Sequence, residues 1–252
     1  MLPELWEVEA GRLPYSVAYG WQRDLHARRI GNEIPDVLLM LEHEHVYTLG
    51  RRFLPEHLLL APDQLVERGI QVYESDRGGS ITYHGPGQLV AYPVVDLRDP
   101  ARRHPDVIRY LRTLEQAIVG AVSPLGVEAT TREGLTGVWV GDHKLAAIGV
   151  NVSRGVAKHG VAINVSTDLD YFRWMVPCGI ADGGVTSLEE ILGTQVSLGD
   201  VAALFAHSLA RVLGRRPVRS DLSSLGLVDA PSTASVSIDQ MRPLPAGRLI
   251  NG

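Results

Sequence analysis

The order of predicted strands and helices constrains the fold of this chain more than any other feature. Helices are predicted over residues 15–30, 63–68 and 105–122, and strands over 36–41, 70–73, 81–83, 88–97, 138–140, 144–152 and 161–165. Two more helices follow, one ending at Leu192 after a capping box and one from the cap Ser197 to Gly214. Strands and helices do not alternate regularly. The sequence therefore predicts an α+β fold with a mixed or mainly antiparallel sheet and flanking helices.

Residues 77–93, RGGSITYHGPGQLVAYP, combine four glycines, an arginine and a histidine with an apolar strand. Such a stretch is either a hairpin with tight turns or a loop that admits a ligand close to its backbone. Further glycine-rich segments occur at 144–150, 154–162 and 176–180. None of them contains a Walker A loop or a GxGxxG fingerprint, so the pattern gives no sign of a nucleotide-phosphate cradle.

Charge and hydropathy narrow the class of protein. The net charge of −5 argues against a general nucleic-acid-binding protein, because such proteins use basic surfaces to displace counterions. No apolar run reaches the roughly 18 residues that a membrane span needs, and the N-terminus lacks the basic and apolar regions of a signal peptide. We expect a cytoplasmic protein. Residues 1–218 are predicted to form one domain, and the Ser-, Pro-, Gly- and Ala-rich residues 219–252 a mobile tail.

Cys178 is the only cysteine of the chain, which excludes an intramolecular disulfide and a multi-cysteine zinc site. A single thiol is more often an inert buried side chain, but Pro177 and Gly179 could present this one at an open turn. A reactive thiol needs a neighbouring base or cation. Sequence spacing alone does not choose among the candidate partners of the thiol. A cysteine–histidine hydrolase is therefore one open interpretation. The candidates are His43, His45, His84, His143, His159, Lys144 and Lys158.

Several motifs, in order from about residue 4 to 215, resemble those of the lipoyl(octanoyl) transferase family. They are Leu41-Glu42-His43 with Val46-Tyr47-Thr48-Leu49-Gly50-Arg51, Arg77-Gly78-Gly79-x-x-Thr82-Tyr83-His84-Gly85-Pro86-Gly87-Gln88-Leu89, Lys144-x-x-Ala147-Ile148-Gly149, His159-Gly160-x-Ala162-x-Asn164-Val165, and Pro177-Cys178-Gly179-Ile180 with Val185-Thr186-Ser187-Leu188. The resemblance implies the fold of lipoate–protein and biotin–protein ligases.

The resemblance also implies a cysteine–lysine dyad of Cys178 and Lys144. An ammonium group beside a thiol stabilises the thiolate, and partial desolvation lets the lysine shuttle protons. His84 could orient the site or only brace its loop. The implied acyl-binding cleft consists of Arg77, Gly78, Gly79, Ser80, Ile81, Thr82, Tyr83, His84, Ala147, Ile148, Gly149, Gly160, Val161 and Ala162.

The implied reaction transfers an octanoyl group from octanoyl-acyl carrier protein to a lysine through an S-octanoyl cysteine. The implied acceptors are lipoyl domains of 2-oxoacid dehydrogenase E2 subunits and the glycine-cleavage H protein, and no cofactor, ATP or metal is expected. Arg51-Arg52 and Arg102-Arg103 could dock acidic carrier proteins, although paired surface arginines are usually only solvated. Three alternatives stay open: an ATP-dependent lipoate–protein ligase, a thioester hydrolase with the same dyad, and a non-catalytic scaffold that binds carrier proteins.

Overall fold

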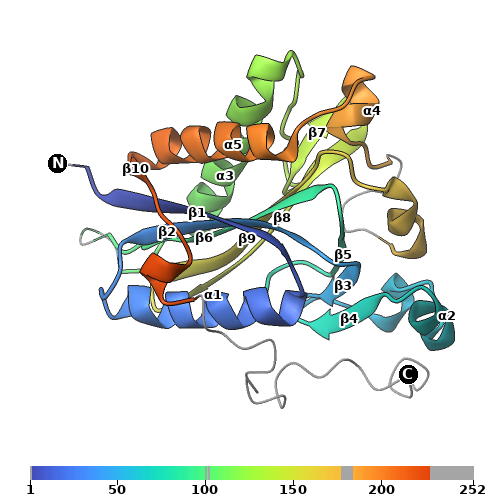
Figure 1. Cartoon of the computed structure of the whole chain (residues 1–252), viewed down its shortest axis with the longest axis horizontal. Helices are drawn as coiled ribbons and strands as arrows, with labels where there is room; N and C mark the ends of the chain where they lie inside the picture. Colours follow the sequence, from blue (N-terminus) through green and yellow to red (C-terminus); the bar gives the residue numbers. More distant parts are fainter. Residues whose placement is uncertain (1, 100, 102, 177–183, 228–252) are drawn as a thin grey trace.

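The computed structural model describes residues 2–99, 101, 103–176 and 184–227. Its main element is a seven-stranded mixed sheet with the order β10-β1-β2-β6-β9-β8-β7 (Figure 1). The pairs β1–β10 and β1–β2 are parallel, and the other neighbours are antiparallel. The strands are β1 (Glu4–Leu13), β2 (Asp36–His43), β6 (Gln88–Val94), β7 (Val138–Val140), β8 (His143–Ser153), β9 (Val156–Asn164) and β10 (Arg216–Arg219). This architecture confirms the predicted α+β class.

Helices cover both faces of this sheet (Figure 1). On one face lies α1 (Tyr15–Ile30), whose buried stripe includes Ala18, Trp21 and Leu25. On the other face α3 (Val107–Val122) and α5 (Leu198–Leu213) pack together over a second apolar core. The Ser197 hydroxyl accepts the Asp200 N–H at 3.3 Å, which satisfies one of the free amides at the start of α5. The predicted helices are therefore present and near their predicted bounds.

A smaller three-stranded sheet, with the order β4-β3-β5, lies at one end of the molecule beside α2 (Figure 1). Its strands are β3 (Val46–Leu49), β4 (Gln71–Glu74) and β5 (Ile81–His84), and α2 spans Pro62–Glu67. Their own core includes Tyr47, Tyr83 and Leu65 together with Phe172 and Met175. The short elements are α4 (Leu188–Leu192) and the 3-10 helices η1 (Pro55–His57), η2 (Ser123–Leu125), η3 (Leu169–Trp174) and η4 (Ser223–Leu225).

Some parts of the fold differ from the sequence-based expectation. Strands β1 and β10 were not predicted, and most of the glycine-rich segment 154–162 is strand β9. The expected tail boundary at residue 218 falls inside β10, and beyond it Leu225 and Leu227 are buried against the α1 face. The last core contacts of the described chain therefore lie past that boundary, and residues 228–252 lie outside the description.

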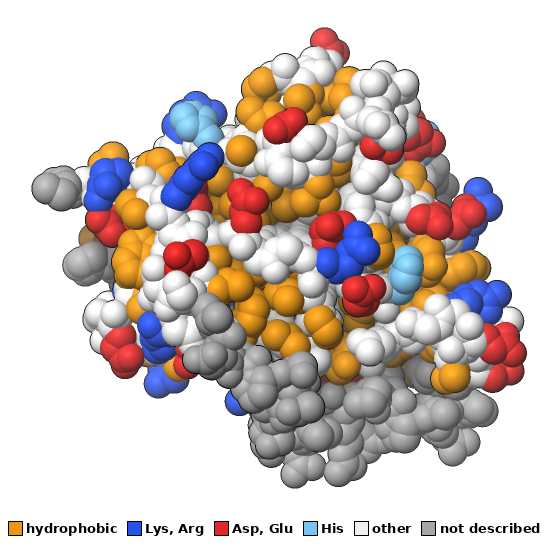
Figure 2. Space-filling view, in the orientation of Figure 1, with side chains coloured by type: hydrophobic (Ala, Val, Ile, Leu, Met, Phe, Trp, Pro, Cys, Tyr) orange, Lys and Arg blue, Asp and Glu red, His pale blue; other side chains and the backbone are white. Residues whose placement is uncertain are grey.

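The described surface carries charges of both signs. On the face shown in Figure 2, acidic and basic side chains are interspersed and no large field of one sign appears. No helix among the described residues is both long and apolar enough to cross a bilayer. One cavity of the described chain is lined by residues of both sheets.

Candidate active site

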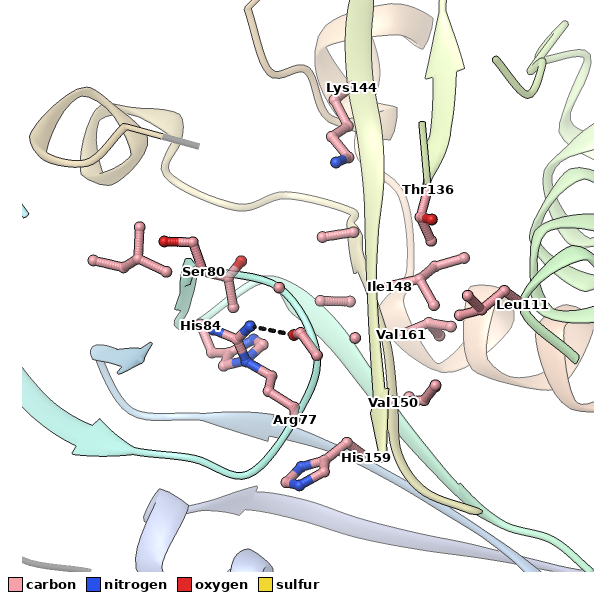
Figure 3. Close-up of a pocket in the computed structure, with 18 of the residues that line it drawn as sticks. Arg77, Ser80, His84, Leu111, Thr136, Lys144, Ile148, Val150, His159 and Val161 are labelled. Atoms are coloured by element: carbon pink, nitrogen blue, oxygen red, sulfur yellow. Dashed lines mark hydrogen bonds between the residues drawn. The ribbon is translucent and has the colours of Figure 1, made fainter. Parts of the chain in front are cut away.

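A cavity of about 640 Å³ is enclosed by residues of both sheets. The loop 77–80 and β5 of the small sheet form one side, and β8 and β9 of the large sheet form the other. Figure 3 shows Lys144 at one end of this cavity and His159 at the other. It also shows Ile148, Val150 and Leu111 grouped on the α3 side of β8, away from Arg77 and His84. The cavity therefore combines an apolar wall with a lysine at one end.

Glycines bring the loop 77–80 into direct contact with β8. The Gly78 N–H donates to the Val150 carbonyl at 2.9 Å. A Cβ atom on Gly149 would lie 3.1 Å from the Gly78 carbonyl oxygen and 3.2 Å from Arg77 Cδ, which is too close for relaxed packing. Gly79 has φ 85°, in the region that favours glycine. These glycines thus let two backbone segments touch and form the cavity wall, so residues 77–80 are a wall loop and not a simple hairpin turn.

Arg77 fixes this wall loop to the small sheet. Its buried guanidinium donates to Thr48 Oγ1 from Nε at 3.0 Å, to the Gly78 carbonyl from Nη1 at 2.9 Å, and to the Thr48 carbonyl from Nη2. A buried guanidinium is costly unless its N–H groups are satisfied, and here they are directed at oxygens of β3 and of the loop itself. Arg77 therefore positions the wall of the cavity.

Lys144 is held near the start of β8. Its backbone N–H donates to the Gly184 carbonyl at 3.0 Å, and its carbonyl accepts the Thr186 N–H at 3.0 Å. The half-buried side chain places Nζ 5.1 Å from the centre of the Trp139 ring, within the range of a cation–π contact. The lysine is thus flanked by the chain that resumes at Gly184, and both Met175 and Val185, on either side of residues 177–183, line the same cavity.

His84 lines the cavity between Lys144 and His159 as a neutral ring (Figure 3). Burial, and then the nearby His43, hold the pKa of His84 well below its usual 6.5. Its Nδ1–H donates to Gln88 Oε1 at 2.8 Å. The Gln88 amide is oriented by two further bonds, because its Nε2 donates to the Tyr83 carbonyl and to Asn164 Oδ1. These contacts support the bracing alternative for His84.

A second neutral histidine, His159, joins the cavity to a charge network. Burial lowers the pKa of His159 to about 4, so the ring is neutral at pH 7 and its Nε2–H donates to Asp76 at 2.6 Å. Asp76 also receives the Lys158 ammonium at 2.7 Å and the Tyr19 hydroxyl at 3.1 Å. Partial burial raises the pKa of Asp76, but the bonds from His159 and Lys158 outweigh it and hold that pKa well below 3.8. The network anchors the chain directly before the wall loop.

All of the predicted acyl-cleft residues line the cavity except Tyr83. The Tyr83 ring is buried on the other side of β5, where it stacks on Tyr171 at 4.7 Å between centroids and bonds His45 Nδ1 at 2.7 Å. Alternation along a strand explains this, because neighbouring residues face opposite sides. Cys178 lies outside the described residues, so its place relative to Lys144 stays a prediction.

The other thiol-partner candidates are spread through the fold. His43 is fully buried and bonds the Leu13 carbonyl and the Tyr92 hydroxyl. His143 is exposed at the start of β8, and Lys158 is paired with Asp76. Among the described residues, no group of three or more His, Asp or Glu side chains could hold a metal ion.

Sequence reasoning missed several residues that line the cavity. They are Tyr15, Tyr92, Val107, Leu111, Gly134, Leu135, Thr136, Val150, Phe172, Met175 and Val185. Most are apolar residues on elements that reach the cavity only through tertiary packing, and nothing in their local pattern separates them from ordinary core positions. Arg52, which the sequence singled out only as part of an arginine pair, also lines the cavity.

Comparison with known proteins identifies the family of this chain. The sequence model of the lipoyl protein ligase A/B catalytic domain matches residues 14–210. The octanoyltransferase of Solibacter usitatus is 49% identical over 81% of this chain and 90% of the relative. The octanoyltransferase of Corynebacterium glutamicum is 44% identical over 84% of this chain and 83% of the relative. The octanoyltransferase of Thermobifida fusca is 43% identical over 82% of this chain and 87% of the relative.

Solved structures show the same fold at low sequence identity. The bipartite lipoate protein ligase of Thermoplasma acidophilum, solved in a study of an archaeal lipoylation system with its E2 lipoyl domain, has a TM-score of 0.70 at 17% identity and covers 95% of this chain and 98% of its own. A lipoate-protein ligase A bound with ATP has a TM-score of 0.67 at 18% identity, covering 90% and 92%. Family model, relatives and fold agree, and the chain belongs to the lipoyl protein ligase A/B catalytic domain family, among its octanoyltransferases.

Proposed function

We propose that this octanoyltransferase moves an octanoyl group from octanoyl-acyl carrier protein to a lysine of lipoyl domains in E2 subunits and of the glycine-cleavage H protein. The observation that carries the proposal is the cavity itself, which has Lys144 at one end and largely apolar walls. Its curated relatives, at 43–49% identity, are named octanoyltransferases. The ATP-bound ligase resembles the chain only in fold, at 18% identity, so it supports the ligase alternative less.

The acyl chain would lie along the glycine-lined part of the cavity. The buried histidines there are neutral and their bonded N–H groups are directed at Gln88 and Asp76, so they add no net charge to the wall. Burying seven methylene or methyl groups at about 0.8 kcal/mol each contributes on the order of 5–6 kcal/mol before ordering costs. That free energy is enough to select a medium-length acyl chain over a short one.

The proposed first step forms a thioester on Cys178. Its thiolate attacks the carbonyl carbon of the carrier thioester, the tetrahedral intermediate collapses, and the carrier thiolate leaves and takes up a proton from the Lys144 ammonium, which becomes neutral. Two observations support a Cys178–Lys144 dyad. The described chain on either side of residues 177–183 lines the cavity, and the Lys144 backbone is bonded to Gly184 and Thr186. The Lys144 ammonium would stabilise the Cys178 thiolate by charge.

In the second step the ε-amine of the acceptor lysine attacks the S-octanoyl carbonyl. An amide bond forms, the Cys178 thiolate leaves, and neutral Lys144 accepts the proton that the amine loses. The dyad then returns to its starting charges. No activation by ATP is needed, because the bond that breaks in each step is already a thioester.

The test is an intact-mass measurement of the enzyme after incubation with octanoyl-acyl carrier protein in the absence of ATP. We expect one octanoyl adduct, located on Cys178 by peptide mapping, that an apo lipoyl domain discharges as an amide. Cys178→Ala should not charge. Transfer that requires ATP would favour the ligase alternative. Release of free octanoate without amide product would favour the hydrolase, and binding of the carrier protein without an adduct would favour the scaffold.

A further inference from the structure

One stretch of the cavity rim exposes apolar side chains beside arginines. We call it the rim patch and define it as Arg51, Arg52, Leu54, Leu59 and Val176. Its three apolar members are 49%, 56% and 44% exposed, and they are three of the six large hydrophobic side chains exposed in the described part of the chain. Figure 2 shows exposed hydrophobic side chains among charged ones at the end of the molecule that carries α2.

A short two-stranded ribbon brings Leu59 and Val176 together. Leu58 and Met175 are an antiparallel bridge pair. The Leu59 N–H donates to the Trp174 carbonyl at 2.9 Å, and the Val176 N–H donates to the His57 carbonyl at 2.8 Å. Because side chains alternate across a strand, Leu58 and Met175 face the core and are buried, while Leu59 and Val176 face outward. The outward face of the ribbon thus carries Leu59 and Val176 together with their half-buried partners Trp174 and His57, and the ribbon directly precedes residues 177–183.

The two arginines extend this apolar surface to the cavity rim. Their backbone N–H groups donate to the carbonyls of Arg77 at 3.1 Å and Gly79 at 3.0 Å, which fixes the turn against the wall loop. Both side chains are exposed, and Arg52 lines the cavity. Within the described ranges neither has an ion-pair partner, and Glu56 is the single carboxylate of residues 51–59.

This composition is that of a protein-binding surface. Arginine is enriched at protein interfaces, and exposed apolar side chains that gather in a patch mark interaction sites, whereas isolated exposed apolar residues need no explanation. Here the apolar side chains belong to a ribbon held by backbone bonds and to the segment 51–59, which includes Arg52 in the lining of the cavity that holds Lys144. A partner with carboxylates near its reacting group would complement Arg51 and Arg52.

We propose that the rim patch docks the acceptor domain, a small folded domain whose target lysine is flanked by carboxylates. This inference rests on the proposed function. The two substrates differ in reach. The carrier delivers its thioester on a long prosthetic arm and can react while its body is remote from the rim. The acceptor amine ends a single lysine side chain, so the body of the acceptor domain must contact the rim for its amine to reach the cavity.

The test separates the two half-reactions. The enzyme is charged with octanoyl-N-acetylcysteamine, a donor without protein or phosphate, and the charged enzyme is then mixed with increasing concentrations of apo lipoyl domain in rapid-quench experiments. A second acceptor, Nα-acetyl-lysine amide, reports the chemistry without docking. The variants are Arg51→Glu and Leu59→Ser, both at residues that do not line the cavity. The controls, Arg109→Glu and Ile108→Ser, change exposed residues of α3 outside the patch.

We expect both rim variants to raise the half-saturating concentration of the lipoyl domain by about 10-fold or more. Three rates should change by less than about twofold in these variants: charging by the small donor, charging by octanoyl-acyl carrier protein, and discharge by the small amine. All rates of the control variants should likewise change by less than about twofold. In Arg51→Glu the half-saturating concentration of the lipoyl domain should also depend less on ionic strength than in the wild type.

An unchanged half-saturating concentration of the lipoyl domain would overturn the proposal. A defect confined to charging by the carrier protein would also overturn it, because the patch would then bind the donor. An equal loss with the small amine would show damage to the site and also contradict docking. If the unmodified charged enzyme transfers nothing to any lipoyl domain, the proposed function itself fails, and that result is distinct from all of these.

Discussion

The pH dependence of stability can be worked out for one buried histidine. His43 is fully buried, donates its Nδ1–H to the Leu13 carbonyl at 2.9 Å and accepts the Tyr92 hydroxyl at Nε2, 2.7 Å away. Burial lowers the pKa of His43 from 6.5 to about 4. Between these two values the unfolded chain binds a proton that the folded chain does not, so stability falls as pH falls. At pH 5 the histidine lowers the free energy of unfolding by about 2 kcal/mol relative to pH 7, since each unit of pKa difference corresponds to about 1.4 kcal/mol.

The experiment compares urea unfolding of the protein with His43 and of its His43→Asn variant at pH 7 and at pH 5. The substitution itself costs stability at pH 7, because it disturbs two buried hydrogen bonds. That cost should shrink by about 2 kcal/mol at pH 5, because asparagine does not titrate there. His159 is present in both proteins, and its contribution cancels; both proteins carry His84→Asn, because His43 lowers the pKa of His84. A cost that is the same at both pH values would refute the reasoning, since His43 would then titrate alike in the folded and unfolded states.

Three further predictions concern packing and chemistry. Gly149→Val should destabilise the fold by about 1–3 kcal/mol in urea unfolding and slow acylation, because its Cβ would crowd the wall loop; unchanged stability would contradict this contact. Leu225→Ala should lower the free energy of unfolding by about 2–5 kcal/mol, because Leu225 is fully buried. Deletion of residues 228–252 should leave the thermal midpoint nearly unchanged, and a larger loss from the deletion than from Leu225→Ala would contradict this boundary of the core. The apparent pKa of Cys178, measured by iodoacetamide labelling, should lie below about 8.5 and rise in Lys144→Ala. An apparent pKa that is the same in both proteins would show that Lys144 is not part of the dyad.

Local sequence patterns were sufficient for most of the elements. The stripe of Ala18, Trp21 and Leu25 predicts α1 because a helix needs one apolar face, and Ser197 marks the start of α5 because its side chain can satisfy a free amide. Strand β1 was missed because a register shift between Glu9 and Arg12 interrupts its alternation. Strand β10 was missed because four mostly exposed residues become a strand only by pairing with the edge of β1.

The chain by itself determined the fold class and the family motifs, and through them part of the cavity wall, but not the cavity residues that α3, η3 and other remote elements contribute. Tertiary structure alone decided how they meet. Gly149 matters because Gly78, far away in sequence, lies against it, and Asp76 becomes an anchor only through Lys158 and His159, 82 and 83 residues later. The rim patch likewise exists only because residues 57–59 pair with 174–176. The physical reason is that periodicity and capping record interactions within a few residues, whereas contacts between remote segments depend on how the two sheets pack.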